Sequence, residues 1–163
     1  MKYSYTIIKR EWIILYIIAL IAVLIDQLAK YAVRTYMQLG ETIPIAGDYF
    51  QLTSHRNNGA AWGIFAGQRW FLILITLVAI IFLIRYARNT TDKWTRYALG
   101  LYMGGALGNA IDRIAFGEVV DFFNVRIINY PIFNTADTFL VCGTILLVIT
   151  TFKQPNNVAK GTN

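Results

Sequence analysis

Four long apolar runs are the feature of this sequence that most limits what it can fold into. They cover residues 12–25, 70–84, 97–111 and 139–152. A transmembrane helix needs about 20 apolar residues, and each run approaches this length once its amphipathic flanks are included. A soluble domain with four such buried helices would need far more polar surface than a chain with 15% charged residues provides. The pattern therefore predicts an all-α membrane protein.

The predicted transmembrane helices form a single polytopic domain over residues 1–163. We place them at residues 12–36, 69–87, 95–112 and 136–153. The first run follows basic residues, as in a secretory signal peptide, but it ends in Ile25-Asp26-Gln27 instead of the small residues of a cleavage site. It is therefore interpreted as a retained helix. The residues after Lys153 are predicted to be a flexible tail.

Two patterns with helical spacing predict how these helices pack. Gly100, Gly104 and Gly108 recur every four residues, which is typical of a helix face that a neighbouring backbone approaches closely. Asp26 and Lys30 stand four residues apart with the acid first, which is the favourable order for an ion pair on one helix. Both patterns are interpreted as structural.

The basic residues are distributed unevenly around the helices. Nine of the 15 Lys and Arg residues lie at the chain ends or between the second and third helices, where only two acidic residues accompany them. The positive-inside rule places that side in the cytoplasm, so we expect both termini to be cytoplasmic. This topology accounts for the net charge of +6 without a nucleic-acid partner.

Two polar segments are expected on the opposite, outer side of the membrane. In the first, residues 42–45 and 49–52 read as two short strands around a turn, and Pro44 confines the first strand to a sheet edge. The second segment, residues 109–137, contains three aspartates. The candidate chemistry of the chain lies in this second segment.

Asp121 and Asp137 are the candidate catalytic pair. Two carboxylates that share one proton supply both the base and the acid that water attack on an amide requires. Simpler roles also exist for each residue. Asp137 can belong to a helix cap made by Asn134 or Thr135, and Asp121 can pair with an arginine, either Arg113 or Arg126.

Nucleophilic catalysis by other side chains is disfavoured. Ser54 and His55 are neighbours in a predicted extended segment, where adjacent side chains point to opposite faces. Cys142, the single cysteine, lies in an apolar run that disfavours a thiolate.

A metal site is not predicted either, and no cofactor is expected. Asp112, Asp121 and Asp137 do not have the spacing of a carboxylate-rich metal loop, and we expect Asp112 to pair with Arg113 at the end of the third helix. A proton-coupled carrier that uses paired intramembrane carboxylates is the alternative function. Four helices are few for a carrier, and no inverted repeat is visible.

Five short motifs occur in order along residues 10–152. They are Asp26-Gln27-x-x-Lys30, Arg56-Asn57-Asn58-Gly59-Ala60-Ala61-Trp62-Gly63, Gly108-Asn109-x-x-Asp112-Arg113, Val119-Val120-Asp121-Phe122 and Phe133-Asn134-x-Ala136-Asp137. In this order and among four apolar runs, they resemble the lipoprotein signal peptidases, or type II signal peptidases, of bacteria.

The resemblance implies an aspartic endopeptidase of the bacterial plasma membrane, with its active site near the outer face. Its substrates would be diacylglyceryl-modified prolipoproteins within the membrane lipids, cut just before the lipidated cysteine. The family fold adds a small extracytoplasmic β-cradle, here over about residues 40–65. By matched motif, Asp121 and Asp137 are the catalytic pair. The substrate-binding residues implied in the same way are Asp26, Asn57, Gly59, Asn109, Arg113, Asn134 and Ala136.

Overall fold

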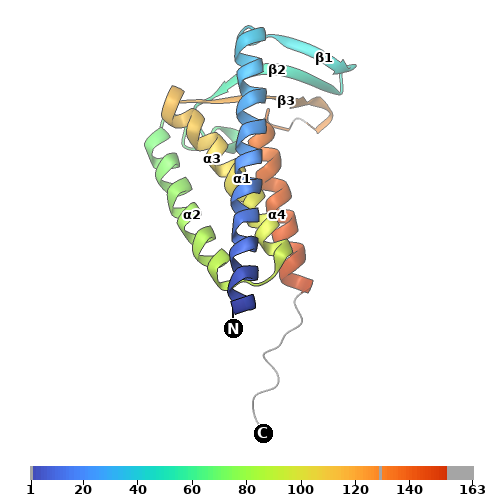
Figure 1. The fold of residues 1–163 in the computed structure, drawn as a ribbon. Helices are drawn as coiled ribbons and strands as arrows, with labels where there is room; N and C mark the ends of the chain where they lie inside the picture. Colours follow the sequence, from blue (N-terminus) through green and yellow to red (C-terminus); the bar gives the residue numbers. More distant parts are fainter. Residues whose placement is uncertain (1, 129, 154–163) are drawn as a thin grey trace.

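A bundle of long helices carries a small antiparallel sheet at one end (Figure 1). The structure is a computed structural model that describes residues 2–128 and 130–153. Within these residues the helices are α1 (Lys2–Tyr36), α2 (Arg69–Asn89), α3 (Lys93–Phe116) and α4 (Thr135–Lys153). The strands are β1 (Thr42–Ala46), β2 (Phe50–Asn57) and β3 (Val119–Val125), and the single-turn helices are η1 (Ala61–Gly63) and η2 (Arg126–Ile128). The predicted tail after Lys153 lies outside the described residues.

Each predicted helix is present, and the first and third are longer than expected. The first was expected over residues 12–36 but begins at Lys2. The third was expected over residues 95–112 but runs from Lys93 to Phe116. Asp92 caps its start, because its carboxylate accepts a hydrogen bond of 2.7 Å from the backbone N–H of Thr95. Gly117 ends the helix in the left-handed region, with φ at +83°, which a residue with a side chain rarely adopts. The chain therefore turns sharply before β3.

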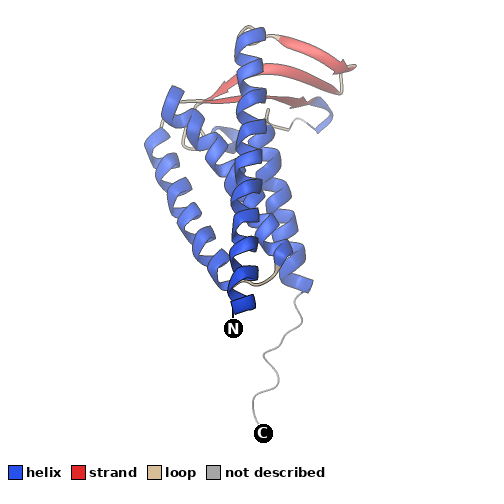
Figure 2. Cartoon of the chain, in the orientation of Figure 1, coloured by secondary structure: helices blue, strands red, loops and turns tan. Residues whose placement is uncertain are grey.

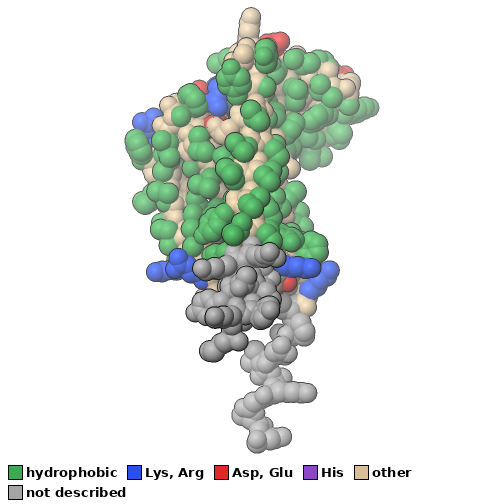
Figure 3. All heavy atoms as spheres, in the orientation of Figure 1, with side chains coloured by type: hydrophobic (Ala, Val, Ile, Leu, Met, Phe, Trp, Pro, Cys, Tyr) green, Lys and Arg blue, Asp and Glu red, His purple; other side chains and the backbone are tan. Residues whose placement is uncertain are grey.

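The surface of the helices is that of a multi-pass membrane protein. In the described part of the chain, three segments are long and apolar enough to cross a bilayer, namely Trp12–Tyr36, Arg69–Asn89 and Thr135–Lys153. The helix α3 does not qualify by composition. Figure 3 shows apolar side chains along the bundle and Lys and Arg side chains gathered near the end that holds the α2–α3 connection. The count of four spans stays a prediction.

The sheet contains one more strand than the sequence indicated (Figure 2). Its strand order in the described residues is β1-β2-β3, and both pairs are antiparallel. The prediction that Pro44 confines its strand to an edge is confirmed, because β1 pairs only with β2 in the part of the chain that the structure describes. β2 was expected to end near residue 52 but continues to Asn57. β3 was not predicted, and it lies outside the expected cradle of residues 40–65.

The glycines of α3 let α1 and α4 approach it at van der Waals distance. A Cβ added to Gly104 would lie 2.5 Å from the Cβ of Ala22 and 2.8 Å from the carbonyl oxygen of Ala19, both on α1. A Cβ on Gly143 of α4 would lie 2.8 Å from the carbonyl oxygen of Ala98 on α3. The predicted packing role of the glycine face is therefore confirmed.

We expect Gly104→Leu to lower the free energy of unfolding by ~1–3 kcal/mol or more, because the new side chain has no space against α1. Thermal unfolding of the purified protein in detergent measures this effect. Ala115→Leu is the matched control, since Ala115 is an exposed residue of the same helix. Equal melting temperatures for the two variants would contradict the close packing of α1 on α3.

Candidate active site

Asp121 is held on β3 by the pairing of that strand with β2. The antiparallel register places Asn57 opposite Val119, so Asn57 is the diagonal neighbour of Asp121. The side-chain amide of Asn57 donates a hydrogen bond of 2.9 Å to Oδ2 of Asp121. Asp121 is 2% exposed, which is rare for a carboxylate.

Asp137 lies in the first turn of α4 and belongs to its N-terminal cap. The backbone N–H of Asn134 donates to Oδ2 of Asp137 at 3.1 Å, and the backbone N–H of Asp137 donates to Oδ1 of Asn134 at 3.0 Å. This reciprocal arrangement confirms the predicted cap at Asn134. The other carboxylate oxygen of Asp137 accepts a hydrogen bond of 2.8 Å from Nδ2 of Asn109 on α3.

A short backbone bridge brings these two aspartates together. The carbonyl oxygen of Phe133 accepts hydrogen bonds from the N–H groups of Phe122 at 3.0 Å and Phe123 at 2.8 Å, and the N–H of Phe133 donates back to Phe123. The bridge sets the start of α4 against β3. As a result, Nδ2 of Asn134 donates to Oδ1 of Asp121 at 2.7 Å. Asn134 therefore hydrogen-bonds to both carboxylates.

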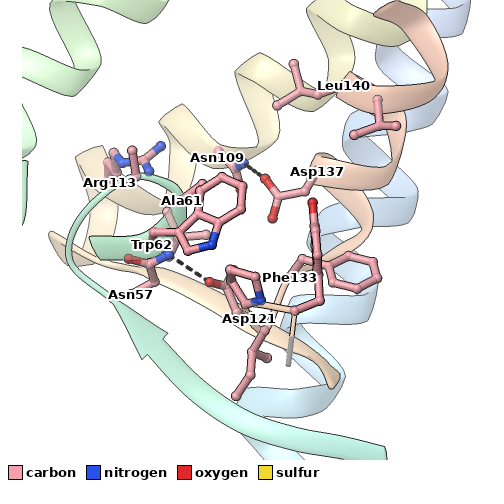
Figure 4. Close-up of a pocket in the computed structure, with 15 residues that line it drawn as sticks. Asn57, Ala61, Trp62, Asn109, Arg113, Asp121, Phe133, Asp137 and Leu140 are labelled. Carbon is pink, nitrogen blue, oxygen red and sulfur yellow. Dashed lines mark hydrogen bonds between the residues drawn. The ribbon is translucent and has the colours of Figure 1, made fainter. Parts of the chain in front are cut away.

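The two carboxylates open into one cavity of about 220 Å³ (Figure 4). Asn57, Asn109 and Arg113 line it together with Asp121 and Asp137. Figure 4 shows that these side chains come from the end of β2, from α3, from β3 and from α4. The cavity also has apolar walls, which include Trp62, Tyr130, Phe133, Leu140 and Val141. Such a mixture of apolar walls and convergent polar groups is typical of a ligand site.

Burial and the neighbouring negative charge change the acidity of Asp121. Loss of solvation raises the pKa of its carboxyl group from 3.8 to about 7, and the charge of Asp137 acts in the same direction. The hydrogen bonds from Asn57 and Asn134 act in the opposite direction but are weaker. The pair is therefore able to hold one proton near neutral pH.

The remaining predicted binding residues are buried and do not line the cavity. Gly59, Asn134, Ala136 and Asp26 were expected to bind substrate, but they lie among the residues that support its walls. Oδ1 of Asp26 accepts hydrogen bonds from Oγ1 of Thr135 at 2.7 Å and from the backbone N–H of Ala136 at 2.8 Å. Asp26 on α1 thus fixes the first turn of α4.

The charged residues near the cavity are paired differently from the prediction in one case. Asp26 and Lys30 form the expected ion pair, with 2.8 Å between Oδ2 and Nζ. Asp112, however, does not pair with Arg113; its carboxylate contacts Lys30 at 3.4 Å and Arg34 at 3.3 Å, both on α1. The expectation followed sequence proximity, but successive residues of a helix point in different directions.

Arg113 instead binds the loop that follows β2. Its Nη2 donates a hydrogen bond of 2.7 Å to the carbonyl oxygen of Gly59, whose N–H in turn donates to Oδ1 of Asn57 at 2.9 Å. Gly59 also has no space for a side chain, since a Cβ would lie 2.9 Å from the carbonyl oxygen of Ile64. Gly59 therefore anchors the loop beside the cavity.

Ser54 and His55, the other candidate catalytic side chains, lie next to each other on β2. Ser54 is 1% exposed whereas His55 is exposed, as expected for neighbours on opposite faces of a strand. Asp112 contacts the basic residues of α1, and its Oδ2 also accepts a hydrogen bond of 3.1 Å from the backbone N–H of Val120. Among the described side chains, no three His, Cys, Asp or Glu residues are grouped closely enough to hold a metal ion.

The sequence analysis assigned no role in the site to two kinds of residue that the structure places near it. The aromatic wall is one: Trp62 stacks edge-on against Tyr130 with 6.1 Å between ring centroids. Lys30 is the other, because it reaches Asn109 besides its ion pair with Asp26. A lysine within an apolar helix was the available signal for Lys30, since a buried charge at membrane depth is costly.

Comparisons with known proteins agree on one family. Residues 18–153 match the family described as signal peptidase (SPase) II. The chain is 51% identical over 138 residues to the lipoprotein signal peptidase of Bacillus subtilis strain 168, covering 82% of this chain and 90% of that protein.

Two solved structures of bacterial membrane enzymes have the same fold. One, determined by the in meso method at 2.3 Å resolution, has a TM-score of 0.81 and 38% identity over 90% of this chain and 92% of the other. The second, at 1.9 Å resolution, has a TM-score of 0.77 and 41% identity over 85% of this chain and 92% of the other. The chain therefore belongs to the signal peptidase II family.

Proposed function

We propose that this protein is an aspartic endopeptidase that removes signal peptides from diacylglyceryl-modified prolipoproteins and cuts just before the lipidated cysteine. The observation that carries this proposal is the joint placement of Asp121 and Asp137 in one cavity, with Asn134 hydrogen-bonded to both. The family is one of peptidases, and this pair supplies the acid and the base that peptide hydrolysis requires. The carrier alternative is not favoured by that family membership.

In the proposed mechanism the pair begins with one proton, held by Asp121, and one negative charge on Asp137. Burial supports the proton on Asp121, and the N-terminus of α4 supports the negative charge on Asp137. Asp137 takes a proton from a water molecule, whose oxygen attacks the scissile carbonyl carbon, while Asp121 gives its proton to the carbonyl oxygen. The tetrahedral intermediate then collapses, Asp137 passes its proton to the leaving nitrogen, and Asp121 recovers its proton from the intermediate.

The other cavity residues are proposed to hold the peptide. Asn57, Asn109 and Arg113 line the cavity beside the two carboxylates and present N–H donors. Such donors bind backbone carbonyl groups and the oxyanion that develops during attack. Four further residues support the cavity without lining it, by fixing the loop after β2 and the start of α4. These are Asp26, Gly59, Asn134 and Ala136. No cofactor is required by this scheme.

We further propose that α3 is a fourth membrane span and that the chain forms a single polytopic domain. The helices alternate in direction, so the N-terminus, the α2–α3 connection and the end of α4 lie at the same end of the bundle (Figure 1). Basic side chains gather at that end, which supports a cytoplasmic location (Figure 3). The cavity and the sheet then lie at the outer face of the plasma membrane, within reach of lipid-anchored substrates.

Asp121→Asn and Asp137→Asn are each expected to lower kcat by at least ~10³-fold, because each change removes one of the two proton-transfer groups. The measurement is cleavage of a diacylglyceryl-modified prolipoprotein by the purified protein in detergent. Asp48→Asn is the matched control, since Asp48 is exposed in the β1–β2 turn and should retain full activity. Cleavage by either site variant at the wild-type rate would exclude the aspartic mechanism.

The pH profile of kcat/KM should have an alkaline limb near pH 7. Activity needs the proton on Asp121, and the pKa of that group is about 7, so the proton is lost as the pH rises through this value. An exposed aspartate would lose its proton near about pH 4. Rates of cleavage measured between about pH 4 and about pH 9 test this expectation. A fall in kcat/KM that begins near pH ~4 would show that Asp121 has the pKa of an exposed aspartate, and would contradict the prediction.

The proposed topology predicts opposite labelling of two engineered cysteines. In a Cys142→Ala background, Asp48→Cys in the β1–β2 turn should react with a membrane-impermeant maleimide in sealed right-side-out vesicles. Thr91→Cys in the α2–α3 connection should react only after the vesicles are permeabilised. Both positions are exposed in the structure, so burial does not limit the reaction. The reverse labelling pattern would show that the sheet and the cavity lie on the cytoplasmic side, and would contradict the proposed topology.

A further inference from the structure

Lys30 is a buried cation that approaches the proposed catalytic pair from the side of α1. Its side chain is 0% exposed and its Nζ has three oxygen partners. These are Oδ2 of Asp26 at 2.8 Å, Oδ1 of Asn109 at 2.9 Å and Oδ2 of Asp112 at 3.4 Å. The two carboxylates balance the positive charge of Lys30. The third partner, Asn109, is a residue that lines the active-site cavity.

The contact with Lys30 determines which way the Asn109 amide points. Oδ1 of Asn109 accepts from Lys30 and, at 3.1 Å, from Nδ2 of Asn134. A lysine ammonium group has only donors, so the amide oxygen must face it. The amide nitrogen is thereby left to donate to Oδ1 of Asp137 at 2.8 Å. With the amide reversed, Nδ2 would face the ammonium group of Lys30 and Oδ1 would face the carboxylate of Asp137.

We propose that Lys30 is a positioning residue of the peptidase, which fixes the Asn109 amide so that its N–H donates to Asp137. This inference rests on the proposed aspartic mechanism. Lys30 itself does not line the cavity. Lys30 acts on the carboxylate of Asp137 through Asn109. A lysine with a purely structural role would have no such contact.

The charge of Lys30 also acts on the pair, in addition to its contact with Asn109. Lys30 and Asp26 face it from α1, Arg113 and Asp112 from α3, and Asp121 itself lies on β3. Asp26 and Asp112 are balanced by Lys30 and Arg34, so the cluster behind the site is close to neutral. The charge of Lys30 lowers the pKa of Asp121, although burial remains the dominant effect. Removal of Lys30 should therefore raise that pKa.

A charge-balanced pair of variants tests this role. Lys30→Met alone leaves Asp26 buried without its partner and risks unfolding, so both variants are made with Asp26→Asn. The amide oxygen that this change introduces can still accept from Thr135 and Ala136. In this background Lys30→Met should lower kcat about 10- to 100-fold with KM within about twofold, relative to Asp26→Asn alone. The alkaline limb of the pH profile should move to higher pH.

Lys30→Gln in the same background separates the two contributions. It removes the charge but keeps an N–H donor, so the alkaline limb should move as with methionine while kcat falls less. This variant also tests the inference where the methionine variant does not fold. Lys93→Met is the matched control, because Lys93 is exposed at the far end of α3 and its loss should change neither kcat nor the pH profile.

A double-mutant cycle with Asn109→Ala tests the route through the amide. If Lys30 acts through Asn109, Lys30→Met should cost little further kcat once the amide is gone, and the two effects should be strongly non-additive. Multiplicative effects, or folded Lys30 variants with wild-type kcat and an unmoved pH profile, would overturn the inference. A wild-type protein that does not cleave the lipidated prolipoprotein would instead overturn the proposed function.

Discussion

The geometry of the site depends on one residue, Asn134, which hydrogen-bonds to both aspartates. Its side-chain amide reaches Asp121 at 2.7 Å, while its backbone N–H reaches Asp137 at 3.1 Å. Asn134 is 0% exposed, so these bonds do not compete with water. The bridge between Phe123 and Phe133 holds it in place. The two buried carboxyl groups are thus kept close together by hydrogen-bond donors that are shielded from solvent.

Much of the helical architecture could be predicted from the apolar runs, because length and composition largely define a membrane helix. The third helix shows where this reasoning is weaker. Its glycines and polar residues make it too polar to qualify by composition, although α1 and α4 pack closely against those glycines. β3 was missed for a related reason. Residues 119–123 lack the alternation of a half-buried strand, and the hydrogen-bonding partners of β3 lie far away in the sequence.

The candidate site could be predicted as a set of residues but not as a network. The two aspartates and the three asparagines stand in recognisable motifs, and the structure brings them together. Which partner each side chain takes depends on directions that spacing does not encode. Asp112, for example, turns toward Lys30 and Arg34, whereas Arg113 turns toward the loop at Gly59. The contact between Lys30 and Asn109 joins residues 79 positions apart, and neither residue reveals it alone.

The pairing of Asp112 with the basic residues of α1 has a consequence for how the helices exist in a bilayer. Asp112 is 0% exposed, and its charged partners in the structure, Lys30 and Arg34, both belong to α1. With α3 as the proposed fourth span, separation from α1 would leave this acid in hydrocarbon without a charged partner, and α1 alone would carry an excess of positive charge. Under that proposal α1 and α3 would have to enter the lipid interior together, because each helix supplies the charged partners of the other.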